Sequence, residues 1–200
     1  MHFEKRKLHA LHRPSRGGQS YRVPGMKVAL HICCGVCAAG AAERLASEGH
    51  QVYGFFYNPN IHPKEEYERR LQAANQVAKE LNFQMEAGLY QPEKWFTDVK
   101  GLENEPEGGK RCEVCFRYRL KQTYAYMLDS GLDAFTTTLT IGPQKSALVI
   151  NRVGQEIGSD RFLVRDFKKQ AGFQRASELA KKWAIHRQHY CGCVYSPGER

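Results

Sequence analysis

The sequence predicts an α/β fold in which helices cover both faces of a mainly parallel β-sheet. Short apolar stretches with β-branched or aromatic residues alternate along the chain with longer segments whose apolar residues recur at helical spacing. A helix between two consecutive strands produces a right-handed crossover, and the two strands are then parallel. The 200 residues are enough to bury one core of this kind without disulfide bridges.

The first two units of the pattern are the clearest. "MKVALHIC" predicts a strand, and the following small residues lead into a helix over "AAGAAERLASEG", where Gly49 is placed to end it. "QVYGFFYNPN" predicts a second strand, and "PKEEYERRLQAANQVAKELN" predicts a helix that begins at Pro63. The alternation continues with a strand at 83–90, a helix at 92–100, a helix after the loop "ENEPEGGKRCEVC" that ends at Asp129, a strand at 134–141, a helix near 144–157, a strand at 161–167 and a helix near 173–184.

The loop "HICCGVC" directly follows the first predicted strand. In parallel α/β sheets, ligands bind beyond the carboxyl ends of the strands, where the loops that follow the strands converge. We therefore expect the functional site at this edge of the sheet.

The net charge of +9 is concentrated in two zones. Residues 1–27 carry seven lysines and arginines against one acidic residue, and residues 161–187 carry eight against two. Such zones bind polyanions, including nucleic acids, although a solvated face has the same composition. We predict a basic N-terminal arm over residues 1–26 and a single α/β catalytic domain over residues 27–200.

No part of the sequence resembles a membrane span or a secretory signal. The apolar runs are shorter than the roughly 20 residues that a spanning helix needs, and the N-terminus has no apolar central region. We expect a cytoplasmic protein with no membrane partner.

The seven cysteines lie in three tight groups, namely Cys33, Cys34 and Cys37, then Cys112 and Cys115, then Cys191 and Cys193. An odd number in a cytoplasmic chain argues against a disulfide framework. The spacings C-C-x-x-C and C-x-x-C allow neighbouring thiolates to reach one metal ion or cluster. Metal binding is therefore the first hypothesis.

Zinc and iron–sulfur ligation remain alternatives at this point. Four cysteines, Cys34, Cys37, Cys112 and Cys115, satisfy a structural zinc site but leave three cysteines without a role. An iron–sulfur cluster held by four thiolates of the first two groups leaves the third group for electron transfer or for a second iron, and we prefer it because it uses more of the chain. The C-x-C pair closes only a small, strained disulfide ring, which is easily reduced; metal ligation explains the same spacing equally well.

Several other side chains are weaker candidates for ligands or proton donors. They are His31 at the end of the first strand, His186 and His189 beside the last cysteines, Asp166 and Tyr190. Each of these residue types is more often a packing or surface residue, so none is assigned a role.

Taken together and in order, five strings resemble the cobalamin-independent epoxyqueuosine reductases, the QueH family. They are "LHICCGVC", "FFYNPNIHPKEEYERR", "EPEGGKRCEVCFRYRL", "TTLTIGPQK" and "DFKKQAGFQRASELAKKWAIHRQHYCGCVYS". The resemblance runs from about residue 27 to residue 196 and leaves out the basic arm. It implies a Rossmann-like, HUP-type sheet and an oxidoreductase that reduces epoxyqueuosine to queuosine at the wobble position of tRNA, the last step of queuosine biosynthesis.

The resemblance also implies cofactors and roles for the cysteines. It places a [4Fe-4S] cluster on Cys33, Cys34, Cys112 and Cys115, with no cobalamin, and it makes Cys191 and Cys193 a redox-active pair. Cys37 is left over and is a candidate ligand of an additional mononuclear iron.

These expectations form one chemical scheme. Conversion of an epoxide to an alkene and water consumes two electrons and two protons, whereas a cluster normally passes single electrons. We hypothesise that an open iron site binds the epoxide oxygen as a Lewis acid, that the cluster delivers electrons and that the cysteine pair ends as a disulfide, which an external electron donor reduces. Candidate contacts to the anticodon loop of tRNA are Lys168, Lys169, Arg175, Arg187 and Tyr195.

Two alternatives differ from this scheme in class. A tRNA sulfur transferase that uses ATP needs a phosphate-binding SGGxDS loop after the first strand, and "HICCGVC" occupies that place. A non-catalytic zinc-dependent RNA-binding module needs neither iron nor the C-x-C pair.

Overall fold

The computed structural model describes residues 25–196, and the predicted basic arm over residues 1–26 lies outside this range except for its last two residues. Four parallel strands form one sheet in the order β3-β2-β1-β4. Their bounds are Lys27–Ile32 for β1, Gln51–Phe56 for β2, Gln84–Ala87 for β3 and Ala134–Thr137 for β4. The predicted parallel sheet is therefore confirmed.

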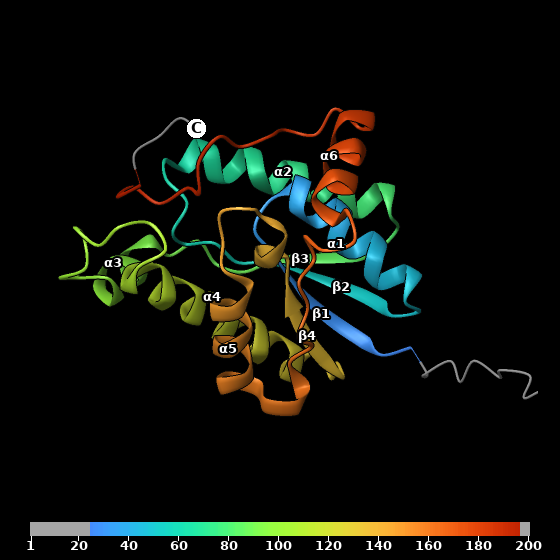
Figure 1. The fold of residues 1–200 in the computed structure, drawn as a ribbon, viewed down its shortest axis with the longest axis horizontal. Coiled ribbons are helices and arrows are strands. Elements are labelled where there is room, and N and C mark those ends of the chain that lie inside the picture. Colours follow the sequence, from blue (N-terminus) through green and yellow to red (C-terminus); the bar gives the residue numbers. More distant parts are fainter. Residues whose placement is uncertain (1–24, 197–200) are drawn as a thin grey trace, which may run out of the picture.

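Helices cover both faces of the sheet, as predicted (Figure 1). On one face, α1 (Gly35–Ser47) packs against α2 (Lys64–Glu80) and α6 (Gly172–Lys182). On the other face, α4 (Lys110–Asp129) packs against α5 (Ala147–Gly158) and contacts β1 and β4. A short helix, α3 (Pro92–Asp98), precedes α4, and two 3₁₀ helices span Thr138–Ile141 and Ser159–Arg161.

The central strand β1 is buried along almost its whole length because it has a strand on each side and helices on both faces. Val28 pairs in register with Val52 of β2 and with Ala134 of β4. Strands β2 and β3 lie on one side of β1, and the chain then crosses to the other side of β1 to form β4. The carboxyl ends of β1 and β4 are therefore the topological switch point of this fold, where ligands of such sheets bind.

The prediction of a strand over residues 134–141 is wrong for the second half of that range. Thr137 Oγ1 accepts a hydrogen bond from the backbone N–H of Leu139 (3.1 Å), which ends the strand and starts the 3₁₀ helix. This early end brings Thr138 to the switch point. A Thr side chain that bonds to the backbone two residues later competes with the sheet ladder, and composition alone does not reveal that competition.

The prediction of a strand over residues 161–167 is also wrong. In this segment Phe162 forms a single parallel bridge with Phe135, and the backbone N–H of Leu163 donates to Phe135 O (2.9 Å). The carbonyl of Leu163 then accepts from the side-chain hydroxyl of Thr136 (2.9 Å) instead of a backbone N–H, so the ladder does not continue. Within residues 25–196, no helix is both long and apolar enough to cross a membrane.

Candidate active site at the switch point

The first cysteine group lies at the carboxyl end of β1, as the sequence predicts. Cys33 and Cys34 follow the strand, and Cys37 lies in the first turn of α1. The three sulfur atoms lie within 4.8 Å of one another, and all three side chains are buried. We call these residues the β1 triad. Gly35 allows α1 to pack closely against α2, because a Cβ there would lie 2.8 Å from backbone atoms of Ala73.

The 3₁₀ helix after β4 fixes Cys33 from the other side of the switch point. Thr138 Oγ1 accepts from the backbone N–H of Cys33 (3.1 Å) and donates to Cys33 Sγ (3.2 Å). Gln188 Nε2, from the segment after α6, donates to Cys34 Sγ (2.9 Å). Two segments far from β1 in the sequence, the 3₁₀ helix after β4 and the segment after α6, therefore hold the β1 triad in place.

The β1 triad carries its negative charge mainly on Cys33. Hydrogen bonds from the thiols of Cys34 and Cys37 hold the pKa of Cys33 well below its ordinary value, and the charge of Lys145 acts in the same direction. The same contact with Cys33 raises the pKa of Cys34 to about 12 and raises that of Cys37. A thiolate at the start of α1 is favoured by the helix dipole, and it is the form in which cysteine ligates a metal.

The second cysteine group lies on α4, which packs on the opposite face of the sheet. Cys112 and Cys115, which we call the α4 pair, occupy the first turns of this helix. The backbone N–H of Gly108 donates to Cys112 Sγ (3.2 Å) from the glycine-rich loop. Cys115 is buried in a small cluster with Trp95 and Cys193, and this burial raises its pKa.

The third group forms a tight turn over Tyr190–Cys193, which we call the CGC turn. The backbone N–H of Cys193 donates to Cys191 Sγ (3.4 Å), and Ser196 Oγ lies 3.5 Å from the same sulfur. A hydrogen bond from the Cys193 thiol, helped by Ser196, lowers the pKa of Cys191 to about 4, and the pKa of Cys193 is raised in return. Cys191 is therefore a thiolate at neutral pH, poised for thiol–disulfide exchange.

This low pKa predicts how Cys191 reacts in the reduced, metal-free protein. Only the thiolate reacts with iodoacetamide, and Cys191 stays a thiolate until the pH approaches its pKa. The rate of alkylation should therefore be nearly constant from about pH 8 to about pH 5 and should fall only towards about pH 4. Peptide mass spectrometry across this range measures the rate. In Ser196→Ala, this decrease in rate should begin at a higher pH, because Ser196 helps to lower the pKa of Cys191. A rate that drops about tenfold per pH unit below about pH 8 would contradict the assignment, since an ordinary thiol behaves in that way.

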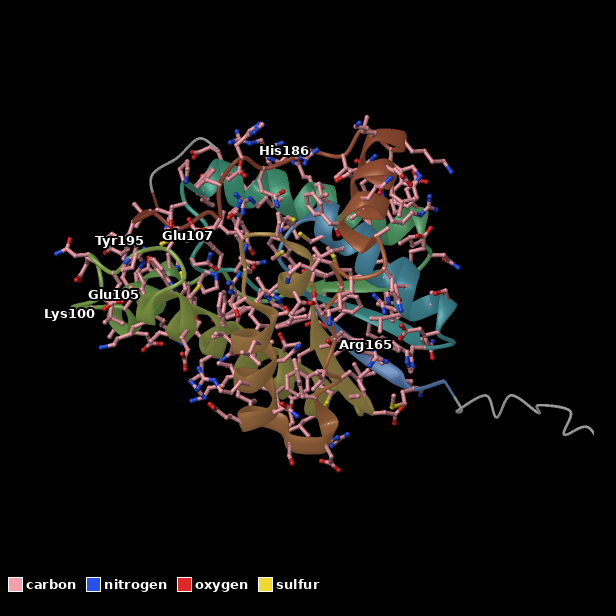
Figure 2. The ribbon with its side chains drawn as sticks, viewed as in Figure 1. Lys100, Glu105, Glu107, Arg165, His186 and Tyr195 are labelled. Atoms are coloured by element: carbon pink, nitrogen blue, oxygen red, sulfur yellow. The ribbon has the colours of Figure 1, made fainter. Side chains whose placement is uncertain are left out.

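The α4 pair and the CGC turn share one pocket, which we call the cysteine pocket. It encloses about 600 Å³ including its open mouth. Its other walls come from α3, the glycine-rich loop and the start of α5. Figure 2 shows Tyr195, Glu105 and Glu107 at this end of the molecule, beside α3, whereas Arg165 lies towards the opposite end. The lining includes Cys112, Cys115, Cys191, Cys193, Trp95 and Phe116.

Two buried arginines give the cysteine pocket a positive wall. Arg119 is 4% exposed and donates to Cys115 O and to Asn58 Oδ1 (3.3 Å each). Among residues 25–196, no carboxylate forms an ion pair with it. Arg111 is 1% exposed, and its Nη1 donates to three backbone oxygens while its Nε has no partner. A buried cation without an acidic partner is costly unless another anion compensates it.

A second cavity adjoins the cysteine pocket and reaches the β1 triad. Cys37 lines it from one side, and Arg187, His189 and Phe173 line it from the other. Lys145 and Cys191 belong to the walls of both cavities. The β1 triad, the α4 pair and the CGC turn therefore border one continuous region at the switch point. A ligand set made only of sulfur suits zinc, copper(I) or an iron–sulfur cluster rather than a hard metal ion.

The structure gives most of the weaker candidates partners within the fold. His31 is fully buried; its Nδ1 lies 2.9 Å from Thr137 Oγ1, and its Nε2 lies 3.2 Å from Tyr57 O. Burial lowers its pKa to about 3, so it is a neutral residue that links β1, β2 and β4. His186 lies 3.3 Å from Glu66, and Tyr190 donates to His62 O. His189 is exposed, and Asp166 pairs with Lys168 (3.3 Å).

The predicted tRNA contacts differ in the partners that they have within the fold. Lys168 Nζ donates to the backbone oxygens of Thr140 and Lys145, and Arg175 pairs with Glu43 (2.6 Å). Tyr195 packs against Trp95 with the Arg111 guanidinium over its ring. Lys169 and Arg187 are exposed, and Arg187 lines the second cavity.

Sequence reasoning missed four residues that border the site: Thr138, Lys145, Gln188 and Arg119. Lys145 and Thr138 belong to the string "TTLTIGPQK", which follows β4. Its position after a strand in a parallel sheet is a signal that would have pointed to the same edge. Arg119 lies in the string "EPEGGKRCEVCFRYRL", four residues after Cys115, but nothing there distinguishes it from the other arginines of the string.

Comparisons with known proteins agree on one family. The model of the family "Epoxyqueuosine reductase QueH" matches residues 28–199. A relative of that name from Streptococcus pyogenes is 40% identical over 178 residues, which cover 84% of this chain and 69% of the relative. One from Thermotoga maritima is 36% identical over 181 residues, 86% of this chain and 91% of the relative.

Solved structures share the fold at low sequence identity. The U34-tRNA thiolase NcsA from Methanococcus maripaludis, solved with its [4Fe-4S] cluster, superposes with a TM-score of 0.58 at 14% identity and covers 90% of this chain and 64% of its own. An NMN synthetase from Francisella tularensis gives a TM-score of 0.53 at 14% identity, covering 88% of this chain and 70% of its own. These neighbours have the Rossmann-like, HUP-type fold that the sequence predicts.

Proposed function

The chain belongs to the QueH family of epoxyqueuosine reductases, and we propose that it reduces epoxyqueuosine to queuosine at the wobble position of tRNA, the last step of queuosine biosynthesis. The observation that carries this proposal is the meeting of all three cysteine groups at the β1–β4 switch point, around adjoining cavities. The substrate is a tRNA that carries epoxyqueuosine, so we place the reaction in the cytoplasm.

The residues present fit an iron–sulfur cofactor. The β1 triad supplies buried sulfur ligands with one thiolate already favoured, and Arg119 beside the α4 pair supplies a buried positive charge that an anionic cluster would compensate. We propose that Cys33, Cys34, Cys112 and Cys115 hold a [4Fe-4S] cluster and that Cys37 ligates an additional iron, with no cobalamin. When bound, such a group supplies single electrons, and an iron with an open position acts as a Lewis acid.

The compactness of the β1 triad favours a second ligand assignment. Among residues 25–196, the group of mutually close sulfur atoms comprises Cys33, Cys34 and Cys37 and does not include the α4 pair. In this alternative, the β1 triad holds the cluster and the α4 pair holds the additional iron. The same two groups of cysteines bind iron in both assignments, and only their partition differs.

The Cys191–Cys193 pair supplies the two electrons. Oxidation of the Cys191 thiolate and the Cys193 thiol to a disulfide releases two electrons and one proton, and water supplies the second proton that an epoxide needs to become an alkene and water. An external dithiol or another two-electron donor then reduces the disulfide and closes the cycle. Trp95 and Phe116 line the cysteine pocket beside the pair, and Tyr195 packs against the cluster that contains Trp95 and Cys193.

We propose that Lys145 contacts the substrate between the two cavities. Lys145 lines both cavities, and its charge contributes to the low pKa values of Cys33 and Cys191, after the hydrogen bonds to their sulfur atoms. A cation in this position can stabilise negative charge on the epoxide oxygen as the C–O bond breaks.

Replacement of Lys145 by alanine is expected to lower kcat/KM by about 10²-fold, whereas arginine at this position should retain most of the activity because it keeps the charge. Single-turnover assays on tRNA that carries epoxyqueuosine, with queuosine measured by mass spectrometry, provide the comparison. Lys169→Ala is the matched control, because Lys169 is exposed outside both cavities. Equal effects at the two lysines would mean that Lys145 acts only through general attraction of tRNA.

The predicted tRNA contacts remain proposals, and Arg187 is the best supported of them. It is exposed at the second cavity, where a phosphate next to the reacting nucleotide could reach it. Lys169 is also exposed. Lys168, Arg175 and Tyr195 would first have to exchange the internal partners that they have here.

The experiment that tests the proposed function combines metal analysis with conversion of tRNA, on protein purified without oxygen. We expect about four irons with matching sulfide, a fifth iron without extra sulfide, and formation of queuosine with a chemical reductant. One zinc per chain and no conversion would favour a non-catalytic RNA-binding module. Sulfur transfer that depends on ATP would favour the tRNA sulfur transferase instead.

A further inference from the structure

The backbone of the CGC turn is held by α2 and by the loop before it. Arg70 Nη2 donates to Tyr190 O (2.9 Å), and Arg70 Nη1 donates to Cys191 O (3.1 Å). The backbone N–H of His62 donates to Gly192 O (2.8 Å). Three successive carbonyl groups are therefore bound by a segment that lies about 120 residues earlier in the chain. Figure 1 shows the C-terminal segment crossing α2 on its way to the end of the molecule that holds α3.

Arg70 is itself oriented by a buried carboxylate. Its Nε donates to Glu66 Oε1 (2.7 Å), and the side chains of Arg70 and Glu66 are 3% and 4% exposed. The other carboxylate oxygen accepts from Arg69 (2.9 Å) and lies 3.3 Å from His186. Buried ion pairs are often no more stabilising than apolar side chains of similar size. A contribution to stability is therefore a weak reason for this pair to be buried beside the CGC turn.

The CGC turn fits closely around the guanidinium group. Gly192 has φ +96°, and a Cβ there would lie 2.9 Å from Ile61 Cγ1 and 3.1 Å from Arg70 Nη1. The Arg70 guanidinium also lies over the ring of Tyr190, 5.2 Å from its centroid. A planar group with five donors can bind Glu66 and two carbonyls at once, whereas a lysine ammonium has neither the fork nor its fixed geometry.

We propose that Arg70, oriented by Glu66, is the positioning residue of the Cys191–Cys193 pair. The inference rests on the proposed function, which assigns a dithiol–disulfide cycle to this pair. In that cycle, the Cys191 thiolate and the Cys193 S–H group form one S–S bond, and two electrons and one proton leave for the substrate, which takes its second proton from water. An external dithiol reverses the change and returns the protons to water. Arg70 keeps the backbone of the turn in one place, so that the two sulfurs stay close to each other and inside the cysteine pocket.

Positioning of this kind acts on the redox equilibrium of the pair. Two thiols that are held close together have a high effective concentration towards each other, which favours the disulfide and makes the dithiol a stronger reductant. Release of the turn should lower the equilibrium constant for disulfide formation. We expect a decrease of about tenfold in Arg70→Gln, which corresponds to a midpoint potential about 30 mV less negative for a two-electron couple.

The test uses iron-loaded protein equilibrated without oxygen in thiol–disulfide buffers of graded potential. After alkylation, mass spectrometry of the peptide that contains Cys191 and Cys193 gives the fraction of disulfide. Arg69→Gln is the matched control, because Arg69 binds the same carboxylate but is 54% exposed and contacts no carbonyl of the turn. Arg70→Lys tests whether charge alone is sufficient.

A shifted potential in Arg70→Gln and in Arg70→Lys, with Arg69→Gln at the wild-type value, is the expected result. An unchanged potential in Arg70→Gln, an equal shift in Arg69→Gln, or full rescue by lysine would overturn the inference. If Arg70→Gln does not fold, as judged by circular dichroism, Arg70→Lys and Glu66→Gln carry the same test. A wild-type pair that forms no disulfide at any buffer potential would refute the proposed function instead, because that outcome does not depend on Arg70.

Discussion

Replacement of Cys191 with serine is expected to abolish repeated turnover, with a fall of about 10³-fold or more in the steady-state rate of queuosine formation. A serine hydroxyl cannot donate two electrons by forming a disulfide with Cys193. The iron content should stay at the wild-type level if the cofactor is held by the other two cysteine groups. Nucleoside mass spectrometry of tRNA over several enzyme equivalents measures the rate, and metal analysis of the same sample measures the iron.

The control for this variant is Ser196→Ala, which removes a hydrogen-bond partner of Cys191 but keeps both thiols. Its rate should fall by about tenfold at most, because one hydrogen bond to a charged group contributes about 1.5 kcal/mol. Full steady-state activity in Cys191→Ser would exclude the dithiol cycle. Loss of iron from that variant would show that Cys191 is a metal ligand rather than an electron store.

Replacement of Cys33 with serine should have the second large effect, namely loss of iron, sulfide and activity together. Cys33 is the residue on which the charge of the β1 triad is concentrated, and it has Thr138 on its other side. A hydroxyl at this position does not replace a thiolate ligand for iron. Inductively coupled plasma analysis and the visible spectrum, on protein reconstituted without oxygen, measure the loss.

Two further variants distinguish the two ligand assignments. If Cys37 ligates only the additional iron, Cys37→Ser should retain four irons with matching sulfide, and Cys112→Ser should lose the cluster. If the β1 triad holds the cluster, the two results should be exchanged. Thr138→Val, which keeps all seven cysteines, is the matched control and should bind the full amount of iron.

The sequence predicted the position of the site better than its details. The run that ends at Ile32 identified β1, and the cysteines directly after it identified the edge of the sheet where ligands bind. The spacing could not show that Cys37 lies within 4.8 Å of Cys33 and Cys34, because a helix that starts at Gly35 turns its side chain back towards them. The closeness of the three sulfur atoms therefore required coordinates, and the partition of the cysteines between the cluster and the additional iron is left to the two variants above.

Counting local charge left out contacts within the fold for a related reason. The composition of the zone at 161–187 predicts a polyanion-binding surface, and it does not show that Arg175 pairs with Glu43, which is 132 residues earlier in the chain. Lys168 is turned inward towards backbone oxygens. Contacts between residues so far apart in sequence depend on how α1 and α6 pack, and that packing is not encoded in the composition of either segment. Arg70 and the CGC turn form a contact of the same kind.

Arg119 forms no ion pair with a carboxylate of residues 25–196, and this has a consequence for the stability of the protein in the cell. Within these residues its buried charge is not compensated, which weakens the metal-free protein, and loading of the proposed cluster would remove the penalty. A ligand that binds only the folded state stabilises that state more as the concentration of the ligand rises. Iron starvation should therefore increase degradation of this protein, so that its abundance, and with it the queuosine content of tRNA, follows the availability of iron.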